Sequence, residues 1–343
     1  MSDKEIFDIA IVGAGPVGLF GSFYAGMRGL KTIVFESRRE VGGALTAVYP
    51  EKFIYDMVGF PKILAADLIK NLDVQSSHFE NRIEKGCKIT EIEKNNDGSF
   101  LITSEKGDNY TSKTVLLTTG MGAFSPRKLP LKNIEKYENQ ENSGIKYIIK
   151  EKKNYYNQNV MIIGGGNSAL DWAHDFNGNS KSVSLVHRVD SWQAHEESID
   201  KLEGSGINVY QPYAVKELIG EDKLEKVVIE NIKTKEIKTV PVDLLIVNIG
   251  FLPSKSKFEK LGLEFKGSEM IVDPTSMQSV SANGIFIAGD ACSFEGKLKL
   301  ICVGSAEAAI AVNHAVKKVD EKASLKPKFS STFFTEKINE KSK

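Results

Sequence analysis

Residues 8–36 read DIAIVGAGPVGLFGSFYAGMRGLKTIVFE, and this stretch decides the fold. An apolar run over residues 8–12 leads into a turn with glycines at positions 13, 15 and 18. A segment rich in Ala, Gly and Leu fits a helix to about Arg28, and residues 32–35 fit a second buried strand, which ends at Glu36. The order strand, helix, strand predicts a parallel βαβ unit with a right-handed crossover.

The glycine turn of this unit suits a nucleotide. Gly13, Gly15 and Gly18 carry no side chain, so the backbone can approach a pyrophosphate, and a helix starting at Pro16 would offer free N–H groups. Glu36 follows about twenty residues on, where a carboxylate accepts hydrogen bonds from ribose hydroxyls. We therefore expect the adenosine of FAD, which has no 2′-phosphate. The alternative is a tight turn without a ligand.

The same pattern returns in residues 160–187, VMIIGGGNSALDWAHDFNGNSKSVSLVH. Gly13 to Glu36 and Gly164 to His187 both span 23 positions, so the chain repeats one nucleotide-binding unit. The second copy ends in His187-Arg188, and an arginine pairs with the 2′-phosphate that a carboxylate would repel. We therefore predict an NADPH site, formed by Gly164, Gly166, Asn167, Ser168, Ala169, His187 and Arg188. The alternative for Arg188 is a solvated surface charge.

Residues 284–290, GIFIAGD, form a third informative segment, an apolar strand that ends in Gly-Asp. An acid at the carboxyl end of a strand, just before a helix, can hold a ribityl hydroxyl, and we predict this role for Asp290. The next helix, from about Val303 to Val319, would direct its N-terminus at the flavin ring and stabilise the reduced flavin. The alternative for Asp290 is a helix cap.

Composition excludes several classes of protein. Lys plus Arg and Asp plus Glu both number 45, so the zero net charge argues against nucleic acid as a partner. No apolar run is long enough to span a membrane, and the charged start, MSDKE, is not typical of a secretion signal. Three scattered cysteines make no disulfide framework, so we expect a cytoplasmic protein.

The length of 343 residues favours two domains, and the repeat indicates how they are arranged. A β-meander and a strand that ends in glycine follow each nucleotide unit, at Thr119-Gly120 and at Ile249-Gly250. We predict an α/β fold of two Rossmann-like, three-layer (ββα) domains. Residues 119–249 would form a nicotinamide-dinucleotide domain inserted into an FAD domain of residues 1–118 and 250–343. Connectors around Gly120 and Gly250 would let the domains rotate.

The paired glycine turns, the two strands that end in glycine, and Gly289-Asp290 resemble the low-molecular-weight thioredoxin reductases over essentially the whole chain. Those enzymes carry a redox Cys-x-x-Cys shortly before the second glycine turn. Here that stretch, residues 147–150, reads YIIK, and the sequence contains no Cys-x-x-Cys. A dithiol relay is therefore excluded on chemical grounds, and electrons must leave directly from the flavin.

Residues 42–52 (GGALTAVYPEK), 55–61 (YDMVGFP) and 122–129 (GAFSPRKL) are similar to the thioredoxin-reductase-like ferredoxin–NADP+ reductases. This resemblance implies hydride transfer between NADP(H) and FAD, single-electron exchange with ferredoxin or a flavodoxin-like protein, and a homodimer. It implies FAD contacts, beyond the first glycine turn, from Glu36, Tyr49, Ile89, Phe124, Asp290 and Thr332.

The same resemblance assigns two aromatic side chains to the flavin ring. Tyr49 would stack on one face, and Phe329, from the C-terminal tail, would cover the other. The alternative for both is a plain core aromatic. Because the flavin carries the chemistry, no acid, base or nucleophile is predicted among the side chains.

Three positions depart from the pattern of that family. Ala44 stands where the family usually has Gln, and Val189 and Gln193 stand where its nicotinamide segment usually has Arg. Each lost charge-assisted contact to a 2′-phosphate costs about 1.5–3 kcal/mol, or roughly ten- to hundredfold in affinity. We therefore predict a weakened preference for NADPH and acceptance of NADH.

Two other hypotheses keep the same cofactors but change the function. In the first, the electron acceptor is dioxygen, a quinone or a thioredoxin-like protein. In the second, the chain is a non-catalytic NAD(P)H-sensing flavoprotein.

Cys292 and Cys302 lie ten positions apart in the sequence. They are either a redox pair or, as we favour, buried structural cysteines.

Overall fold

The computed structural model describes residues 5–48, 50–120, 124–138, 140–149, 151–253, 258, 261–327 and 329–341. The chain divides into two compact units, and unit 1 is discontinuous. Unit 1 contains Met1–Ala123 and Pro253–Lys343, and unit 2 contains Phe124–Leu252. The observed boundaries lie a few residues beyond 118 and 249, because β9 (Phe124–Pro126) and β18 (Phe251–Pro253) pair with each other where the chain crosses.

Unit 1 is built on one mixed sheet with a parallel centre. Its centre is β1 (Ile6–Val12), which pairs in parallel with β2 (Thr32–Glu36) and β8 (Asn109–Leu117). β1, β2 and the second half of β8 are mostly apolar and buried, as expected for strands covered on both faces. The sheet order is β19-β20-β21-β22-β8-β1-β2-β5, with β5 at Arg82–Lys85 and β22 at Ile285–Ile287.

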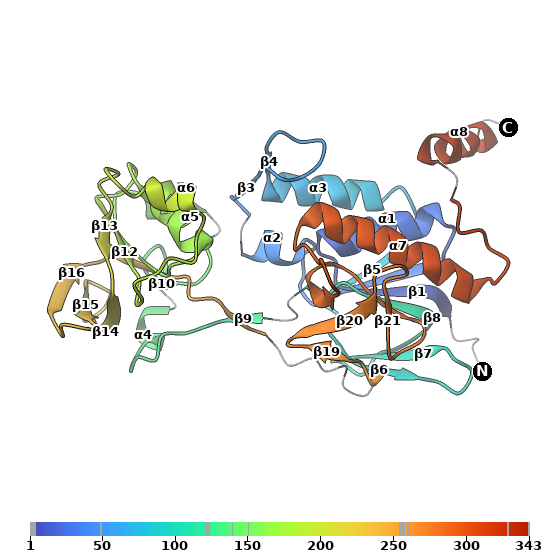
Figure 1. Ribbon diagram of the computed structural model, residues 1–343, viewed down its shortest axis with the longest axis horizontal. Helices are drawn as coiled ribbons and strands as arrows, with labels where there is room; N and C mark the ends of the chain where they lie inside the picture. The colour runs from blue at the N-terminus through green and yellow to red at the C-terminus, as the bar shows by residue number, and fades with distance from the viewer. Residues whose placement is uncertain are drawn as a thin grey trace. The chain divides into compact units, whose positions relative to one another are not determined.

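Helices and antiparallel strands cover the two faces of this sheet. α1 (Pro16–Met27), α3 (Ala65–Ser76) and α7 (Ile301–Val319) lie on one face (Figure 1). β6 (Ile89–Lys94) and β7 (Phe100–Ser104) extend from β8 on the other side. The smaller elements of unit 1 are α2 (Gly43–Ala47), β3 (Phe53–Ile54), β4 (Ile63–Leu64), β19 (Phe265–Lys266), β20 (Glu269–Asp273), β21 (Gln278–Ser279), η3 (Gly289–Ala291), β23 (Cys292–Ser293) and α8 (Ser330–Lys341).

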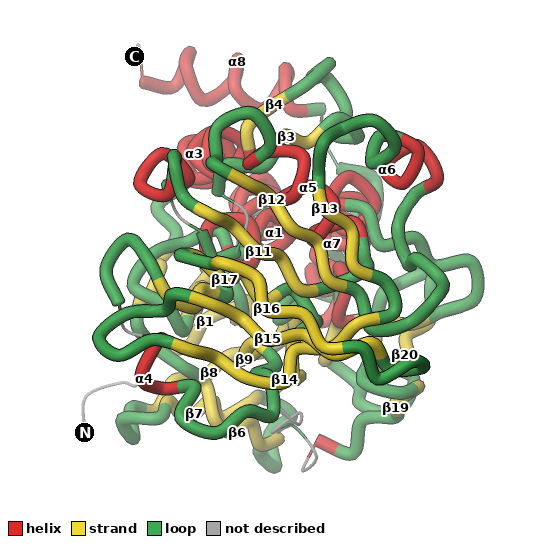
Figure 2. The backbone as a smooth tube through the Cα atoms, turned by 90° about the vertical axis from the view of Figure 1, so that its left-hand side faces the viewer, coloured by secondary structure: helices red, strands yellow, loops and turns green. Residues whose placement is uncertain are grey.

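Unit 2 repeats the plan with fewer strands. A parallel sheet of order β10-β17-β11-β12-β13 contains β11 (Asn159–Ile163) and β12 (Ser182–Val186), with α5 (Asn167–Phe176) between them in the chain. A three-stranded antiparallel sheet, β14-β15-β16, forms a further layer (Figure 2). The remaining elements are α4 (Glu135–Glu138), β10 (Gly144–Lys146), η1 (Lys152–Tyr155), α6 (Glu196–Asp200), β13 (Asn208–Tyr210), β14 (Tyr213–Ile219), β15 (Lys226–Asn231), β16 (Ile237–Pro241) and β17 (Leu244–Val247).

The layers of unit 2 follow from the alternation of side chains along β11, which face two different apolar clusters. Met161 and Ile163 pack toward the antiparallel sheet with Val227 and Ile229, whereas Val160 and Ile162 pack in the cluster that contains α5. Side chains alternate across a strand, so β11 supplies one apolar row to each layer. The predicted α/β fold with two three-layer units is confirmed.

The meander predicted after the second nucleotide unit is a three-stranded sheet, which begins with β14 at Tyr213. The C-terminal tail contains a helix, α8. One expectation needs correction. Asp290 does not directly precede an α-helix, because η3 and β23 intervene before α7 starts at Ile301. Within the described ranges, no helix has both the length and the apolar content of a membrane span.

Candidate functional site: two glycine turns

The first glycine turn joins β1 to α1, and contacts with its own backbone explain two of its glycines. Gly13 has φ +108°, and a Cβ on it would lie 2.5 Å from the carbonyl oxygen of Thr118. A Cβ on Gly18 would lie 1.9 Å from the carbonyl oxygen of Gly13. Any side chain at Gly18 would therefore force α1 away from the turn.

The front of this turn is open. A Cβ on Gly15 would meet only the Cα of Gly43, at 3.9 Å. Gly15 also caps α1 without a side-chain hydrogen bond, and Pro16 begins the helix. The first-turn N–H groups thus face an open cradle at a helix N-terminus, which is the arrangement that binds a pyrophosphate.

Glu36 fixes the shape of this turn. Its side chain is 5% exposed, and Oε2 accepts a hydrogen bond from the amide of Ala14 at 3.0 Å. Oε1 accepts from the amide of Arg38 at 2.9 Å. Because a carboxylate has about four acceptor positions, it keeps capacity for a ribose hydroxyl. The predicted residue therefore lies at the end of β2, beside the turn.

Gly289 and Asp290 lie at the carboxyl end of β22, next to β8 in the sheet. Gly289 has φ +75°, and Asp290 is exposed in η3. The first turn of α7 returns to this point, since a Cβ on Gly304 would lie 2.7 Å from Val17 and 3.2 Å from the Cα of Gly289. Gly304 thus allows α7 to approach both α1 and η3.

Of three other predicted flavin contacts, the structure describes the side chain of one, Ile89. Ile89 is 8% exposed within the core, so a contact to a nucleotide would involve its main chain. Tyr49 lies outside the described residues. Phe124 belongs to β9, and its side chain is outside the described part.

The C-terminal tail lies far from the glycine turn of its own chain. Phe333 and Phe334 of α8 pack on Phe79, with ring centroids 5.6 Å and 6.0 Å apart. Phe79 in turn covers Gly26, at the C-terminal end of α1, whereas the turn lies at the N-terminal end, about 18 Å away along the helix. Phe329 is 82% exposed, and Thr332 is exposed. The structure therefore does not bring Phe329 or Thr332 to the first turn of the same chain.

The second glycine turn joins β11 to α5 and is built differently. A Cβ on Gly164 would lie 2.4 Å from the carbonyl oxygen of Asn248, and one on Gly165 would lie 2.1 Å from the ring of His187. Gly166, by contrast, would meet only the carbonyl oxygen of Gln193, at 3.8 Å. It caps α5 without a side-chain hydrogen bond. The middle of this turn is therefore open, as at Gly15.

The segment after β12 folds back onto the second turn. The amide of Gln193 donates to the carbonyl oxygen of Gly165 at 2.8 Å, and the amide of His195 donates to Asn167 Oδ1 at 2.8 Å. His187 is 7% exposed and stacks on Trp192, with centroids 5.0 Å apart. The His187 ring thus supports the turn from beneath.

Arg188 is an exposed cation next to the second turn. It directly follows His187, and no hydrogen bond or ion pair engages it among the described residues. Nearby, Lys233 pairs with Asp190 at 2.6 Å, and Val189 is 40% exposed. Ala169 is buried in the first turn of α5, and Ser168 precedes it. The structure therefore groups the seven predicted residues of the second site around one turn.

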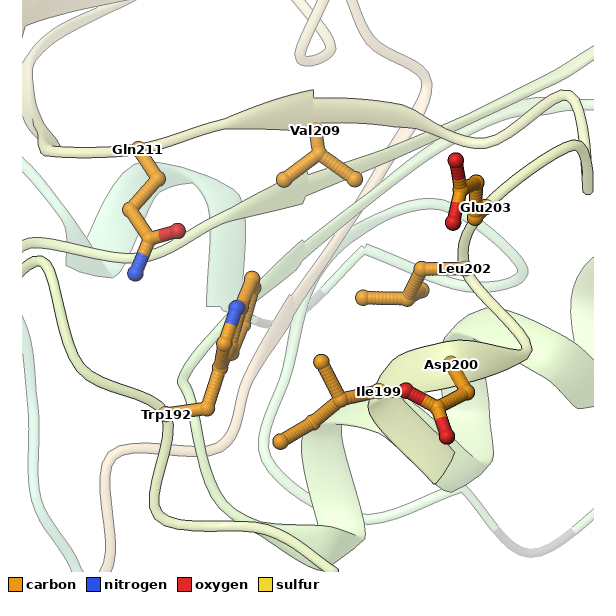
Figure 3. Close-up of a pocket in the computed structure, with 7 residues that line it drawn as sticks. All are labelled: Trp192, Ile199, Asp200, Leu202, Glu203, Val209 and Gln211. Atoms are coloured by element: carbon orange, nitrogen blue, oxygen red, sulfur yellow. The ribbon is translucent and has the colours of Figure 1, made fainter. Parts of the chain in front are cut away.

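A pocket of about 340 Å³ lies beside this segment, with Trp192 among its lining residues (Figure 3). Trp192 faces the apolar side chains of Ile199 and Leu202, and Asp200 and Glu203 line one side. Two carboxylates disfavour a phosphate in the pocket itself. A 2′-phosphate would therefore depend on Arg188.

No disulfide joins the three cysteines. Cys87, Cys292 and Cys302 are all free, and the first two are buried. Burial raises the pKa of the Cys292 thiol to about 12, and the carboxylate of Glu307 adds to the shift. Among the described residues, no cluster of three or more His, Cys, Asp or Glu side chains is arranged to hold a metal ion.

Sequence reasoning missed a buried ion pair under η3. Lys297 Nζ donates to both carboxylate oxygens of Glu307, at 2.6 Å to Oε2, and the two side chains are only 6% and 5% exposed. Glu307 also accepts from the amide of Gly289 at 2.9 Å. The available signal was a single acid in the otherwise small and apolar stretch ICVGSAEAAIAV, residues 301–312.

The family model that matches is described as pyridine nucleotide-disulphide oxidoreductase, and it covers residues 7–314, including both glycine turns. The chain belongs to this family. As a member, it is an oxidoreductase with two Rossmann-like units.

Relatives within the family are similar over their full length. A protein of Bacillus subtilis (strain 168) named ferredoxin–NADP reductase 2 is 42% identical over 335 residues, which are 98% of this chain and 99% of that protein. A ferredoxin–NADP reductase of Halalkalibacterium halodurans is 40% identical over 332 residues, or 96% of this chain and 99% of its own length. The family resemblance inferred from the motifs is confirmed.

Solved structures agree on the fold. T. acidophilum thioredoxin reductase gives a TM-score of 0.78 at 25% identity and covers 94% of this chain and 100% of its own. Thioredoxin reductase of Lactococcus lactis gives 0.77 at 24% identity, with 92% and 99% covered.

Proposed function

We propose that this chain is an FAD-dependent ferredoxin–NADP+ reductase. The observation that carries the proposal is the 42% identity, over 98% of this chain, to a protein of that name. The sequence adds a chemical argument, because it contains no Cys-x-x-Cys with which to reduce a disulfide. Bound FAD would accept a hydride from the nicotinamide and return electrons singly to an iron–sulfur or flavin protein.

In this proposal unit 1 binds FAD. Gly13, Gly15 and Gly18 admit the pyrophosphate to the N-terminus of α1, and Glu36 accepts ribose hydroxyls. Asp290 takes a ribityl hydroxyl at the carboxyl end of β22. The open cradle at Gly15 supports this assignment, as does the buried carboxylate of Glu36, which has acceptor capacity left.

Unit 2 binds the nicotinamide dinucleotide. Gly166 lets the pyrophosphate approach α5, and Asn167 holds the segment after β12 in place. Arg188 pairs with the 2′-phosphate of NADPH. Because Val189 and Gln193 supply no second cation, and because Asp200 and Glu203 line the adjacent pocket, NADH is accepted as well.

The active form in this proposal is a homodimer, located in the cytoplasm. Phe329 and Thr332 lie far from the first turn of their own chain, so they would cover the flavin of a partner chain. The exposure of Phe329, at 82%, supports this view. Ferredoxin or a flavodoxin-like protein receives the electrons, and three free cysteines suit a reducing compartment.

A coupled assay tests the function. Purified protein with NADPH, ferredoxin and cytochrome c should reduce the cytochrome at a rate proportional to ferredoxin. Oxidation of NADPH by dioxygen or a quinone should be slow by comparison. Equal rates with and without ferredoxin would favour another acceptor and contradict the proposal.

A further inference from the structure

The buried pair of Lys297 and Glu307 lies beneath the turn that carries Asp290. Glu307 is on α7, and Lys297 is in the segment before it. Their side chains are 5% and 6% exposed, which distinguishes them from the exposed ion pairs elsewhere on the chain. A buried pair is weak evidence for stability, because desolvation of both charges offsets their attraction. The contacts of this pair point to another role.

Those contacts converge on one end of η3. Glu307 Oε2 accepts the amide of Gly289 at 2.9 Å and faces the thiol of Cys292 at 3.5 Å. The thiol also lies 3.2 Å from the carbonyl oxygen of Gly289. The carboxylate thus satisfies a buried amide directly before Asp290, and Lys297 compensates its charge. Gly289 has φ +75°, so this amide is held in a backbone conformation that few residues adopt.

We propose that Glu307 and Lys297 are positioning residues for the flavin site. Glu307 orients the Gly289–Asp290 backbone through the Gly289 amide, and Lys297 keeps the buried carboxylate compensated. Neither side chain is proposed to touch the flavin. The inference rests on the proposed function, in which Asp290 binds FAD in unit 1.

Two double variants separate orientation of the turn from simple loss of a buried pair. Lys297→Met with Glu307→Gln removes both charges but keeps an oxygen for the Gly289 amide. Lys297→Met with Glu307→Leu removes both charges and that oxygen. Replacement of a whole buried pair by neutral side chains is tolerated far better than loss of one partner, so both variants should fold.

The measurement is the FAD dissociation constant of the full-length protein, obtained from the rise in flavin fluorescence on dilution. We expect the Gln variant to lie within about threefold of wild type and the Leu variant to bind FAD about tenfold or more weakly. The thermal midpoints of the two FAD-free proteins should be similar. Glu5→Gln is the matched control, since its pair with Lys31, at 3.1 Å, is exposed and lies in the same unit, and it should change nothing.

Equal dissociation constants in the two double variants, whether tight or weak, would overturn the inference, because the oxygen would then have no effect. A wild-type protein that cannot take up FAD would contradict the proposed function, and this inference with it. The two failures are therefore distinguishable.

Discussion

The two glycine turns share a spacing but differ in what supports them. In unit 1 the third glycine, Gly18, packs on the carbonyl of Gly13, and the strand ends in Glu36, which binds the Ala14 amide. In unit 2 the matching helix position is Ala169, and the strand ends in His187, whose ring lies under Gly165. In the proposed function, the same strand–turn–helix geometry thus serves two nucleotides, and the residue at the end of the second strand adapts it to each.

The first way to break this comparison is Gly18→Ala against Ala169→Gly. The new Cβ at Gly18 would lie 1.9 Å from a backbone oxygen, so α1 must move and the FAD site opens. We expect FAD affinity to fall by about a hundredfold or more. Ala169→Gly should cost only about 1 kcal/mol in helix stability. Flavin content after purification measures the first effect and thermal unfolding the second; a flavin-replete Gly18→Ala protein would contradict this view of the turn.

The second test removes the charge that sets the second site apart. Arg188→Ala should lower kcat/KM for NADPH by about ten- to hundredfold and leave NADH unchanged, because only NADPH carries the 2′-phosphate. Lys216→Ala, which breaks an exposed pair with Glu230 in the same unit, is the control. Equal losses for both nucleotides would show that Arg188 binds a group that the two share.

The third test restores the missing cations. Val189→Arg and Gln193→Arg should each raise the preference for NADPH over NADH by about tenfold, since each adds a charge-assisted contact. Steady-state kinetics with both nucleotides measure the ratio. In the wild type we expect a ratio below about a thousandfold, and a larger one would mean that Arg188 suffices alone.

The smallest effect is expected at Cys292, whose thiol contacts the carbonyl oxygen of Gly289 in η3. Burial raises the pKa of Cys292 to about 12, so at pH 8 the thiol stays protonated and unreactive. Cys292→Ala should retain ferredoxin reduction within about threefold, because no thiol carries electrons. Alkylation mapped by mass spectrometry should modify the less buried Cys302 first. Rapid labelling of Cys292, or loss of turnover in the variant, would instead support electron transfer through a thiol.

The sequence predicted the features that depend on local pattern. β1, β2 and the helix after the first turn lie within two residues of their predicted bounds, because glycine spacing and apolar runs determine them directly. The first turn of α7 also reaches Gly289, although Asp290 does not directly precede the helix.

The missed features depend on contacts between distant segments. α8 is held by Phe333 and Phe334 against Phe79, more than 250 positions earlier in the chain, and no local pattern shows that contact. Lys297 and Glu307 can pair only because α7 folds back against η3, and no local sequence pattern shows that contact. The burial of His187 required the stack on Trp192 and the absence of a side chain at Gly165.

The most direct test of the central claim is an anaerobic titration of the flavin-loaded protein with NADPH, followed by oxidised ferredoxin. Two nucleotide sites that serve one electron path predict loss of the visible flavin absorbance with NADPH and its return when ferredoxin is added. A yellow protein that NADPH does not bleach, or a bleached one that ferredoxin does not reoxidise, would contradict the account.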